Sequence, residues 1–196
     1  MSRLAVALLA IALPITAVAT PETYTFDTVH TFPYFTVDHL GFSTLYGRFD
    51  RSSGKFTLDK AAKTASLELA IQTASISTGH PTDHGAYSRT RDDHLRSADF
   101  FNAVEFPIMT YKADRVKFNG DNVSSVEGNL TLLGVTKPVT LHLDHWKCGP
   151  NPYSKKEMCG GNASGTLKRS DFGMKFGIPA ISDELKLMLV FEAYRD

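Results

Sequence analysis

Three histidines and three aspartates gather in one stretch of the chain, and such side chains often bind metal ions. They are His80, Asp83, His84, Asp92, Asp93 and His94. A His-x3-His spacing places both imidazoles on one face only where the chain is helical. Pro81 and Gly85 disfavour a helix there. We therefore expect no metal site, and we interpret the charges around Arg91 as a solvated surface.

Side chains suited to nucleophilic catalysis are plentiful, but they form no recognisable motif. The sequence has no Gly-x-Ser-x-Gly elbow and no glycine loop that could cradle a phosphate. Lys plus Arg and Asp plus Glu both number 21, so the basic excess typical of nucleic-acid-binding proteins is missing. We expect no enzymatic activity, no cofactor and no nucleic-acid partner. The alternative, an enzyme acting on a lipid or other small molecule, would need an ionisable pair facing a cavity.

Cys148 and Cys159 are the only two cysteines of the 196-residue chain. The ten residues between them include four turn formers, Gly149, Pro150, Asn151 and Pro152. A zinc site would need a second pair of ligands at CxxC or HxxxH spacing nearby, and none is present. In an oxidising compartment the pair predicts a disulfide across the mouth of a hairpin loop, worth roughly 3 kcal/mol in the chain-entropy model.

The N-terminal residues indicate export. Arg3 precedes an unbroken apolar run from Leu4 to Leu13, and Ala17-Val18-Ala19 is a small-x-small cleavage site. The run is too short to span a membrane, so we interpret residues 1–19 as a secretory signal peptide, with a retained N-terminal anchor as the alternative. Residues 20–196 would then form one globular domain, because no linker, repeat or low-complexity tract divides them.

Alternation of apolar and polar residues with a period of two predicts half-buried antiparallel strands through most of this domain. Leu67, Leu69 and Ile71 alternate with polar or small residues, and Leu185, Leu187, Leu189 and Phe191 share one side of a last strand. The predicted strands are 23–30, 33–38, 45–58, 65–73, 107–117, 123–133, 137–148, 162–170 and 185–195. The turn signals are Ser52-Ser53-Gly54, Asn119-Gly120-Asp121-Asn122, Gly134, Gly160-Gly161 and Ser182-Asp183.

About eight strands result if the first two are one interrupted strand. Helical patterning is confined to Tyr87–Phe101, which permits one or two short helices. Many antiparallel strands with few helices predict an all-β sandwich or closed barrel. A barrel of about eight strands is wide enough to hold either packed side chains or one small ligand.

Several strings, in this order, carry a family resemblance. They are Asp27–Thr31, Phe35–Ser43, Tyr46–Phe49, Arg91–Phe101 with Phe106-Pro107, Gly128–Val139, Arg169–Met174 and Ile181–Leu185. From about Tyr24 to the C-terminus the chain resembles the YceI-like family of periplasmic, lipocalin-like proteins. The resemblance implies a periplasmic location and an eight-stranded antiparallel barrel with a helix laid against it. It also implies a long apolar channel that holds a polyisoprenoid chain, such as an isoprenoid quinone.

Candidate channel residues follow from the resemblance combined with the strand pattern. Leu130, Leu132, Val139 and Leu141 flank the expected turn at Gly134, so all four should point to one face of a hairpin. The complete set is Phe35, Val37, His39, Phe100, Phe101, Phe106, Leu130, Leu132, Val139, Leu141, Phe172, Leu187 and Leu189. The alternative for the aromatic residues is that they fill the gap between helix and barrel. His39 and His94 fall on family motifs, which implies a polar contact near the pocket mouth or a structural hydrogen bond.

The leading hypothesis is a periplasmic protein that binds a long isoprenoid or similar lipid for transport, storage or stress protection. The first alternative is a filled barrel that acts as a stress or interaction protein without lipid, and the second is the small-molecule enzyme. Transient membrane contact and a homodimer are further options.

Overall fold

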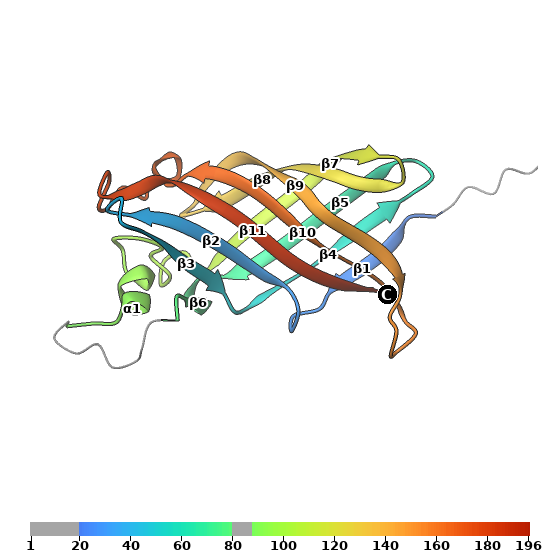
Figure 1. Ribbon diagram of the computed structural model, residues 1–196, viewed down its shortest axis with the longest axis horizontal. Coiled ribbons are helices and arrows are strands. Elements are labelled where there is room, and N and C mark those ends of the chain that lie inside the picture. Colours follow the sequence, from blue (N-terminus) through green and yellow to red (C-terminus); the bar gives the residue numbers. More distant parts are fainter. Residues whose placement is uncertain (1–19, 80–87) are drawn as a thin grey trace, which may run out of the picture.

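The computed structural model describes residues 20–79 and 88–196, so the signal-peptide prediction and the histidines at 80 and 84 lie outside the described residues. Nearly all of the described chain is antiparallel β-structure (Figure 1). The strands are β1 (Glu22–Phe26), β2 (Phe32–His39), β3 (Ser43–Phe49), β4 (Ser52–Asp59), β5 (Thr64–Gln72), β6 (Ile76–Ser77), β7 (Ile108–Asn119), β8 (Asn122–Leu132), β9 (Val135–Pro150), β10 (Glu157–Lys168) and β11 (Ile181–Arg195). The helical segments are α1 (Arg91–Arg96), η1 (Thr73–Ser75) and η2 (Arg169–Phe172). None of the described helices is long and apolar enough to cross a membrane.

Eight strand positions close into a barrel, because three of them are each filled by two shorter strands in succession. The pairs β1–β2, β3–β4 and β5–β6 form these interrupted positions, and β7 to β11 fill the other five. The ring closes where β1 pairs with β11, with Tyr24 opposite Arg195. The predicted all-β, eight-stranded antiparallel barrel with one or two short helices is confirmed. The predicted strand at 45–58 is broken between Phe49 and Ser52, so it forms β3 and β4.

The three interruptions are joined by hydrogen bonds into a girdle, defined here by Thr31, Asp50, Ser52 and Ser75. The buried hydroxyl of Ser52 donates to the carbonyl oxygen of Thr31 at 2.8 Å. The Asp50 N–H donates to the carbonyl oxygen of Ser75 at 3.0 Å. Ser52 therefore lies inside the barrel wall at the start of β4, and the prediction of a turn at Ser52–Gly54 was wrong.

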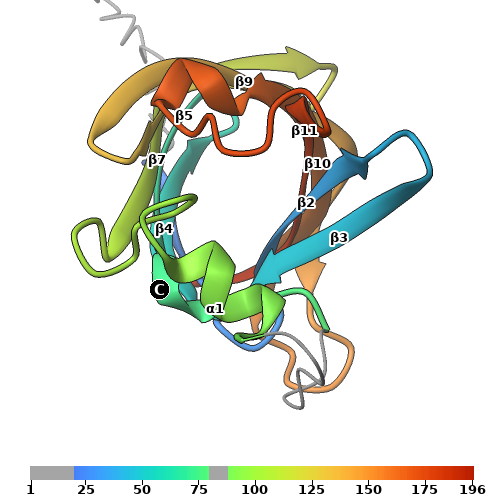
Figure 2. The same ribbon diagram turned by 90° about the vertical axis from the view of Figure 1, so that its left-hand side faces the viewer.

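The two ends of the barrel are built differently. We call them the helix end, where α1 lies, and the termini end, where β1 begins and β11 ends (Figure 1). At the termini end the sheet is continuous, since β1 pairs with both β4 and β11. At the helix end the sheet stops at β6, which pairs with β3 alone. Figure 2 looks onto this end, with α1 across one side of the rim and the loop between η2 and β11 opposite.

Arg96 of α1 covers the open sheet edge at β6. Its guanidinium donates to the carbonyl oxygens of Ala74 and Ile76, both at 2.9 Å. Thr90 caps the helix by accepting a hydrogen bond from the N–H of Asp93. The segment that contains α1 is thus docked onto the barrel by side chains, because no strand ladder joins it to β6 or β7 among the described residues.

Two further turn predictions were wrong, and both segments lie within long strands. Gly160 and Gly161 belong to β10, where a side chain at Gly161 would collide with the carbonyl oxygen of His145. The glycine signal there marks a close backbone approach within a strand. Ser182 and Asp183 lie in an irregular part of β11, where the Asp183 carboxylate accepts hydrogen bonds from the N–H and hydroxyl of Ser170 at 2.8 and 2.7 Å.

The two hairpins on either side of β9 follow their predictions. Leu133 and Gly134 join β8 to β9 with φ angles of 51° and 73°, the combination that two-residue hairpins favour. Cys148 and Cys159 stand opposite each other on β9 and β10 and form a disulfide with an S–S distance of 2.04 Å. The predicted disulfide is therefore confirmed.

Candidate binding cavities in the barrel lumen

The lumen contains three cavities in a row along the barrel. The helix-end cavity has a volume of about 210 Å³, the central cavity about 100 Å³ and the termini-end cavity about 50 Å³. Phe35, Phe101 and Leu185 line both the helix-end and the central cavity. Leu141 and Leu189 line both the central and the termini-end cavity. Neighbouring cavities therefore share wall residues, which places the three in sequence along the lumen.

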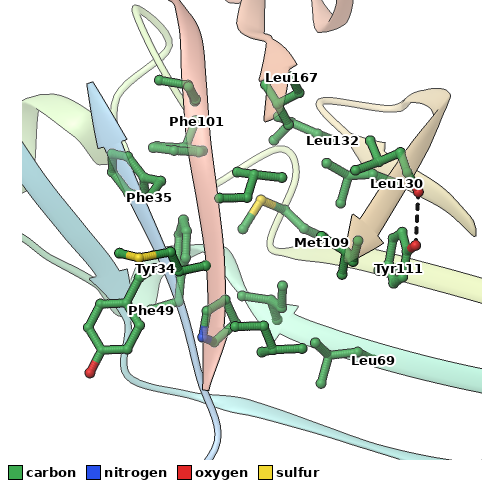
Figure 3. Close-up of a pocket in the computed structure, with 18 residues that line it drawn as sticks. Tyr34, Phe35, Phe49, Leu69, Phe101, Met109, Tyr111, Leu130, Leu132 and Leu167 are labelled. Carbon is green, nitrogen blue, oxygen red and sulfur yellow. Dashed lines mark hydrogen bonds between the residues drawn. The ribbon is translucent and has the colours of Figure 1, made fainter. Parts of the chain in front are cut away.

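The side chains that line the central cavity are apolar except for two tyrosines, Tyr34 and Tyr111 (Figure 3). The Tyr111 hydroxyl lies 3.2 Å from the carbonyl oxygen of Val126 and 2.9 Å from that of Val139, and it donates to these backbone groups. Burial raises the pKa of Tyr111, so the phenol stays neutral at physiological pH. The hydroxyl group is thus already bonded, and the central cavity offers a ligand mainly dispersion contacts.

Most of the residues proposed from the sequence lie at the walls of these cavities. The four residues that flank Gly134 share one face, as predicted, and they line the central cavity. The predicted residues that line it are Phe35, Phe101, Leu130, Leu132, Val139, Leu141, Leu187 and Leu189. Val37, His39 and Phe100 line the helix-end cavity instead.

Phe106 and Phe172 line none of the three cavities, unlike the other residues proposed from the sequence. Phe106 packs on the β8–β9 turn, where its ring lies 3.0 Å from the position that a Cβ of Gly134 would occupy. Phe172 is buried in η2, only 2% exposed, and belongs to the hydrophobic core.

A second set of wall residues was not predicted from the sequence, although a signal for some of them was present. Met109, Tyr111 and Ala113 are buried at alternate positions of β7, the same period-two pattern that identified other strands. The missed residues of the central cavity are Pro33, Tyr34, Phe49, Leu69, Ile71, Met109, Tyr111, Leu167, Leu185 and Met188.

The helix-end cavity differs from the others because basic side chains join its apolar wall. Its lining includes two histidines and two arginines, His39, Arg91, His94 and Arg169, and it includes no Asp or Glu among the described residues. His94 both lines the cavity and makes a structural hydrogen bond, since its Nε2 lies 2.8 Å from a carboxylate oxygen of Asp99. This hydrogen bond holds the pKa of Asp99 below its usual range.

Arg169 is the most buried charged side chain of the cavity, 2% exposed. Its Nε donates to Ser182, its Nη1 to Met174 and Phe176, and its Nη2 to Ile181; every acceptor is a backbone carbonyl oxygen at 2.8–3.3 Å. Burial lowers the pKa of Arg169, but a guanidinium stays charged at neutral pH. These bonds hold the loop between η2 and β11 over the barrel rim.

Aromatic rings fill the termini end around the smallest cavity. Phe56 stacks on Tyr24 with ring centroids 4.9 Å apart and also contacts Trp146 at 6.0 Å. Phe26 packs edge-on against Phe191 at 5.9 Å. We call Tyr24, Phe26, Phe56, Trp146 and Phe191 the aromatic plug.

The aspartates considered as metal ligands have other partners. Asp92 accepts hydrogen bonds from the N–H and hydroxyl of Thr78 at 3.0 and 2.6 Å. Asp93 lies at the first turn of α1 and pairs with Arg96 at 3.1 Å. His80, Asp83 and His84 lie outside the described residues.

A closed antiparallel barrel with an apolar lumen and one polar end places the protein in the class of lipocalin-like barrels. More specifically, the chain belongs to the YceI-like domain family, whose model matches residues 24–193. A UPF0312 protein of Pseudomonas aeruginosa (strain LESB58) is 40% identical over 167 residues, which cover 85% of this chain and 82% of the relative.

Solved structures show the same fold. A Campylobacter jejuni YCEI protein superposes with a TM-score of 0.66 at 28% identity, covering 81% of this chain and 90% of that one. A polyisoprenoid-binding domain from Saccharophagus degradans superposes with a TM-score of 0.62 at 18% identity, covering 88% of this chain and 98% of that domain. The family prediction made from the sequence strings is therefore confirmed.

Proposed function

We propose that this protein is a periplasmic carrier or store that binds a long isoprenoid lipid, such as a polyprenyl quinone, inside the barrel. The observation that carries the proposal is the row of three cavities along the lumen, whose walls are apolar except for the basic groups at the helix end. Aromatic and branched aliphatic walls suit isoprene units, because they pack against the chain without requiring hydrogen bonds. The polyisoprenoid-binding domain of Saccharophagus degradans shares the fold, which adds support.

The size of the cavities sets a condition on this proposal. An apolar cavity of about 150 Å³ accommodates one benzene molecule, so the central and termini-end cavities each hold less than one ring. A polyprenyl chain must therefore displace side chains of the lumen wall to pass from one cavity to the next. The small volumes also favour the second candidate, a filled barrel that binds no lipid.

Exchange with a bilayer follows from the chemistry of such a ligand. Water-to-apolar transfer contributes about 0.8 kcal/mol per CH₂, but a lipid that leaves a membrane is already in an apolar solvent. Selection among lipids then depends on the shape of the lumen and on polar groups at its end. The exposed Leu40 and Phe42, at the tip of the β2–β3 hairpin beside the helix end, suit transient contact with the membrane.

The test combines lipid extraction with one blocking substitution. Organic extracts of freshly purified protein should contain a prenyl lipid by mass spectrometry. Leu132→Trp should fill the central cavity and abolish the bound lipid while the melting temperature is retained. Val104→Trp is the matched control, because Val104 is 95% exposed and its enlargement leaves the lumen unchanged.

The filled barrel predicts a different result. Overpacking an occupied core costs about 1–3 kcal/mol, so Leu132→Trp would lower the stability and neither form would carry lipid. Wild-type protein that carries no lipid and takes up none from offered prenyl quinones would end the carrier proposal.

A further inference from the structure

The guanidinium of Arg169 retains an unused hydrogen-bond donor at the helix-end cavity. A guanidinium has five N–H groups. Nε uses one, Nη1 uses two and Nη2 uses one, all on backbone carbonyl oxygens. One N–H of Nη2 therefore has no acceptor among the described residues, while the side chain is 2% exposed and lines the cavity.

The charge of Arg169 is also uncompensated by a direct ion pair. No carboxylate oxygen of the described residues lies within 4.0 Å of it, and Asp183 is engaged by the N–H and hydroxyl of Ser170. The Asp183 carboxylate acts on the guanidinium only at longer range, so an oxygen acceptor brought into the cavity would add the one direct contact that the remaining N–H lacks.

Other groups in the same wall strengthen the preference for an acceptor. The side chains of His39 and Arg91 make no hydrogen bond to another described residue, and both line the cavity. In the central cavity, the buried Tyr111 hydroxyl already donates to backbone carbonyls. A polar head group is thus stabilised at the helix end and would lose hydrogen bonds if it moved deeper.

We propose that the helix-end cavity is the head-group site of the bound lipid and that Arg169 selects for an oxygen acceptor at the end of the prenyl chain. The inference rests on the proposed function. The acceptor is a quinone carbonyl or a phosphate oxygen, which share this chemistry. At about 210 Å³ the cavity exceeds the ~150 Å³ that holds a benzene ring, so a substituted ring or a phosphate fits it. The tail then extends through the central cavity toward the aromatic plug.

Arg169 suits this selection because its position is fixed before the ligand arrives. Its four bonds hold the guanidinium against the loop that runs from Met174 to Ser182, so little side-chain freedom is lost on binding. A lysine ammonium group has only three N–H donors, so it could not make the four bonds to the loop and a fifth bond to the ligand.

The experiment measures affinities for three probes of equal tail length: a prenyl quinone, a prenyl phosphate and the prenyl hydrocarbon without a head group. Wild-type protein should prefer one or both oxygen-bearing probes by roughly 10- to 100-fold, the range for a hydrogen bond to a charged group. Arg169→Met should remove this preference while the hydrocarbon still binds. Lys175→Met is the control, since it removes an exposed positive charge from the same loop outside the lining.

Two further measurements cover the case in which Arg169→Met fails to fold. The infrared carbonyl band of ¹³C-labelled quinone bound to the wild-type protein should lie at lower frequency than in hexane. The double variant Arg91→Gln, His39→Phe should reduce the preference for oxygen-bearing probes while the hydrogen bonds of Arg169 stay intact. Equal affinity for all three probes overturns the head-group site and leaves the carrier proposal standing. A preference that survives Arg169→Met, or an unshifted carbonyl band, overturns the role of Arg169. Failure of every probe to bind instead overturns the carrier proposal itself.

Discussion

The two ends of the barrel use similar residue types for different purposes. At the termini end, β1 pairs with β4 and β11, and the aromatic plug fills the interior over a cavity of about 50 Å³. At the helix end the sheet stops at β6, α1 is held by Arg96, and the cavity of about 210 Å³ has basic groups in its wall. Aromatic residues occur at both ends, but only at the termini end do they interlock within a continuous hydrogen-bonded wall.

This difference assigns stability to one end and access to the other. Opening the termini end would break strand ladders and separate stacked rings. Moving α1 would break a few side-chain hydrogen bonds, each worth about 1 kcal/mol net, and would expose the half-buried Leu95, but it would break no strand ladder among the described residues. A ligand should therefore enter at the helix end, because that end can change shape while the rest of the barrel stays folded.

The largest expected effect comes from removing one ring of the plug. Phe56→Ala should lower the free energy of unfolding by about 3–5 kcal/mol, as for other buried Phe→Ala changes. The matched change at the helix end is Phe176→Ala. The centroid of the Phe176 ring lies 5.2 Å from those of His94 and Phe100, but the residue is 46% exposed. It should cost less than about 1 kcal/mol. Urea unfolding measures the free energy of unfolding of both variants. Equal losses would contradict the assignment of stability to the termini end.

The disulfide provides the next effect in size. Replacing both Cys148 and Cys159 with serine should lower the melting temperature, with a loss of roughly 3 kcal/mol from the closed loop. The bond clips the β9–β10 hairpin at the termini end, so affinity for an offered prenyl quinone should be unchanged. Lost binding with an intact fold would show that the two ends are coupled. Titration of unfolded, unreduced wild-type protein should find no free thiol.

The smallest effect is a pH dependence at the β1–β2 interruption, next to the girdle between the two ends. His30 Nδ1 lies 2.8 Å from a carboxylate oxygen of Asp27, and this hydrogen bond raises the pKa of His30. Its stabilisation is therefore present below the ordinary pKa of 6.5 and is lost as the pH rises through the raised value. Asp27, whose pKa the same bond lowers, contributes above its ordinary 3.8 and loses that contribution in stronger acid.

His30→Gln tests this dependence by urea unfolding. At pH 5.5 the variant should be less stable than the wild type by under about 1 kcal/mol, the range for exposed pairs, and at pH 8.5 the difference should vanish. High salt should reduce the difference at pH 5.5. An equal gap at both pH values would show that His30 acts by packing.

The sequence predicted the parts of this molecule that depend on local pattern. Leu130 and Leu132 share a face with Val139 and Leu141, because period-two alternation and the Gly134 turn together fix the hairpin register. Gly160 and Gly161 led to a wrong turn prediction, since a glycine pair can mark either a turn or a close approach between strands. The hydrogen bonds of Arg169 could not be predicted from the sequence, because their acceptors lie in a loop and at the start of β11, whose paths depend on tertiary structure. The packing of Phe106 on the β8–β9 turn also depends on tertiary structure, so the sequence pattern did not predict it.

The girdle at Thr31, Asp50, Ser52 and Ser75 also bears on how this scaffold can diversify. It divides the barrel into two rings that share β7 to β11 and otherwise use different segments of chain. Insertions or replacements in β2, β3, β6 and α1 can reshape one rim while the other ring keeps its own pairing. Such a scaffold is modular: an engineer could graft new recognition loops at one rim and select for new cargo, leaving the opposite ring to ensure folding.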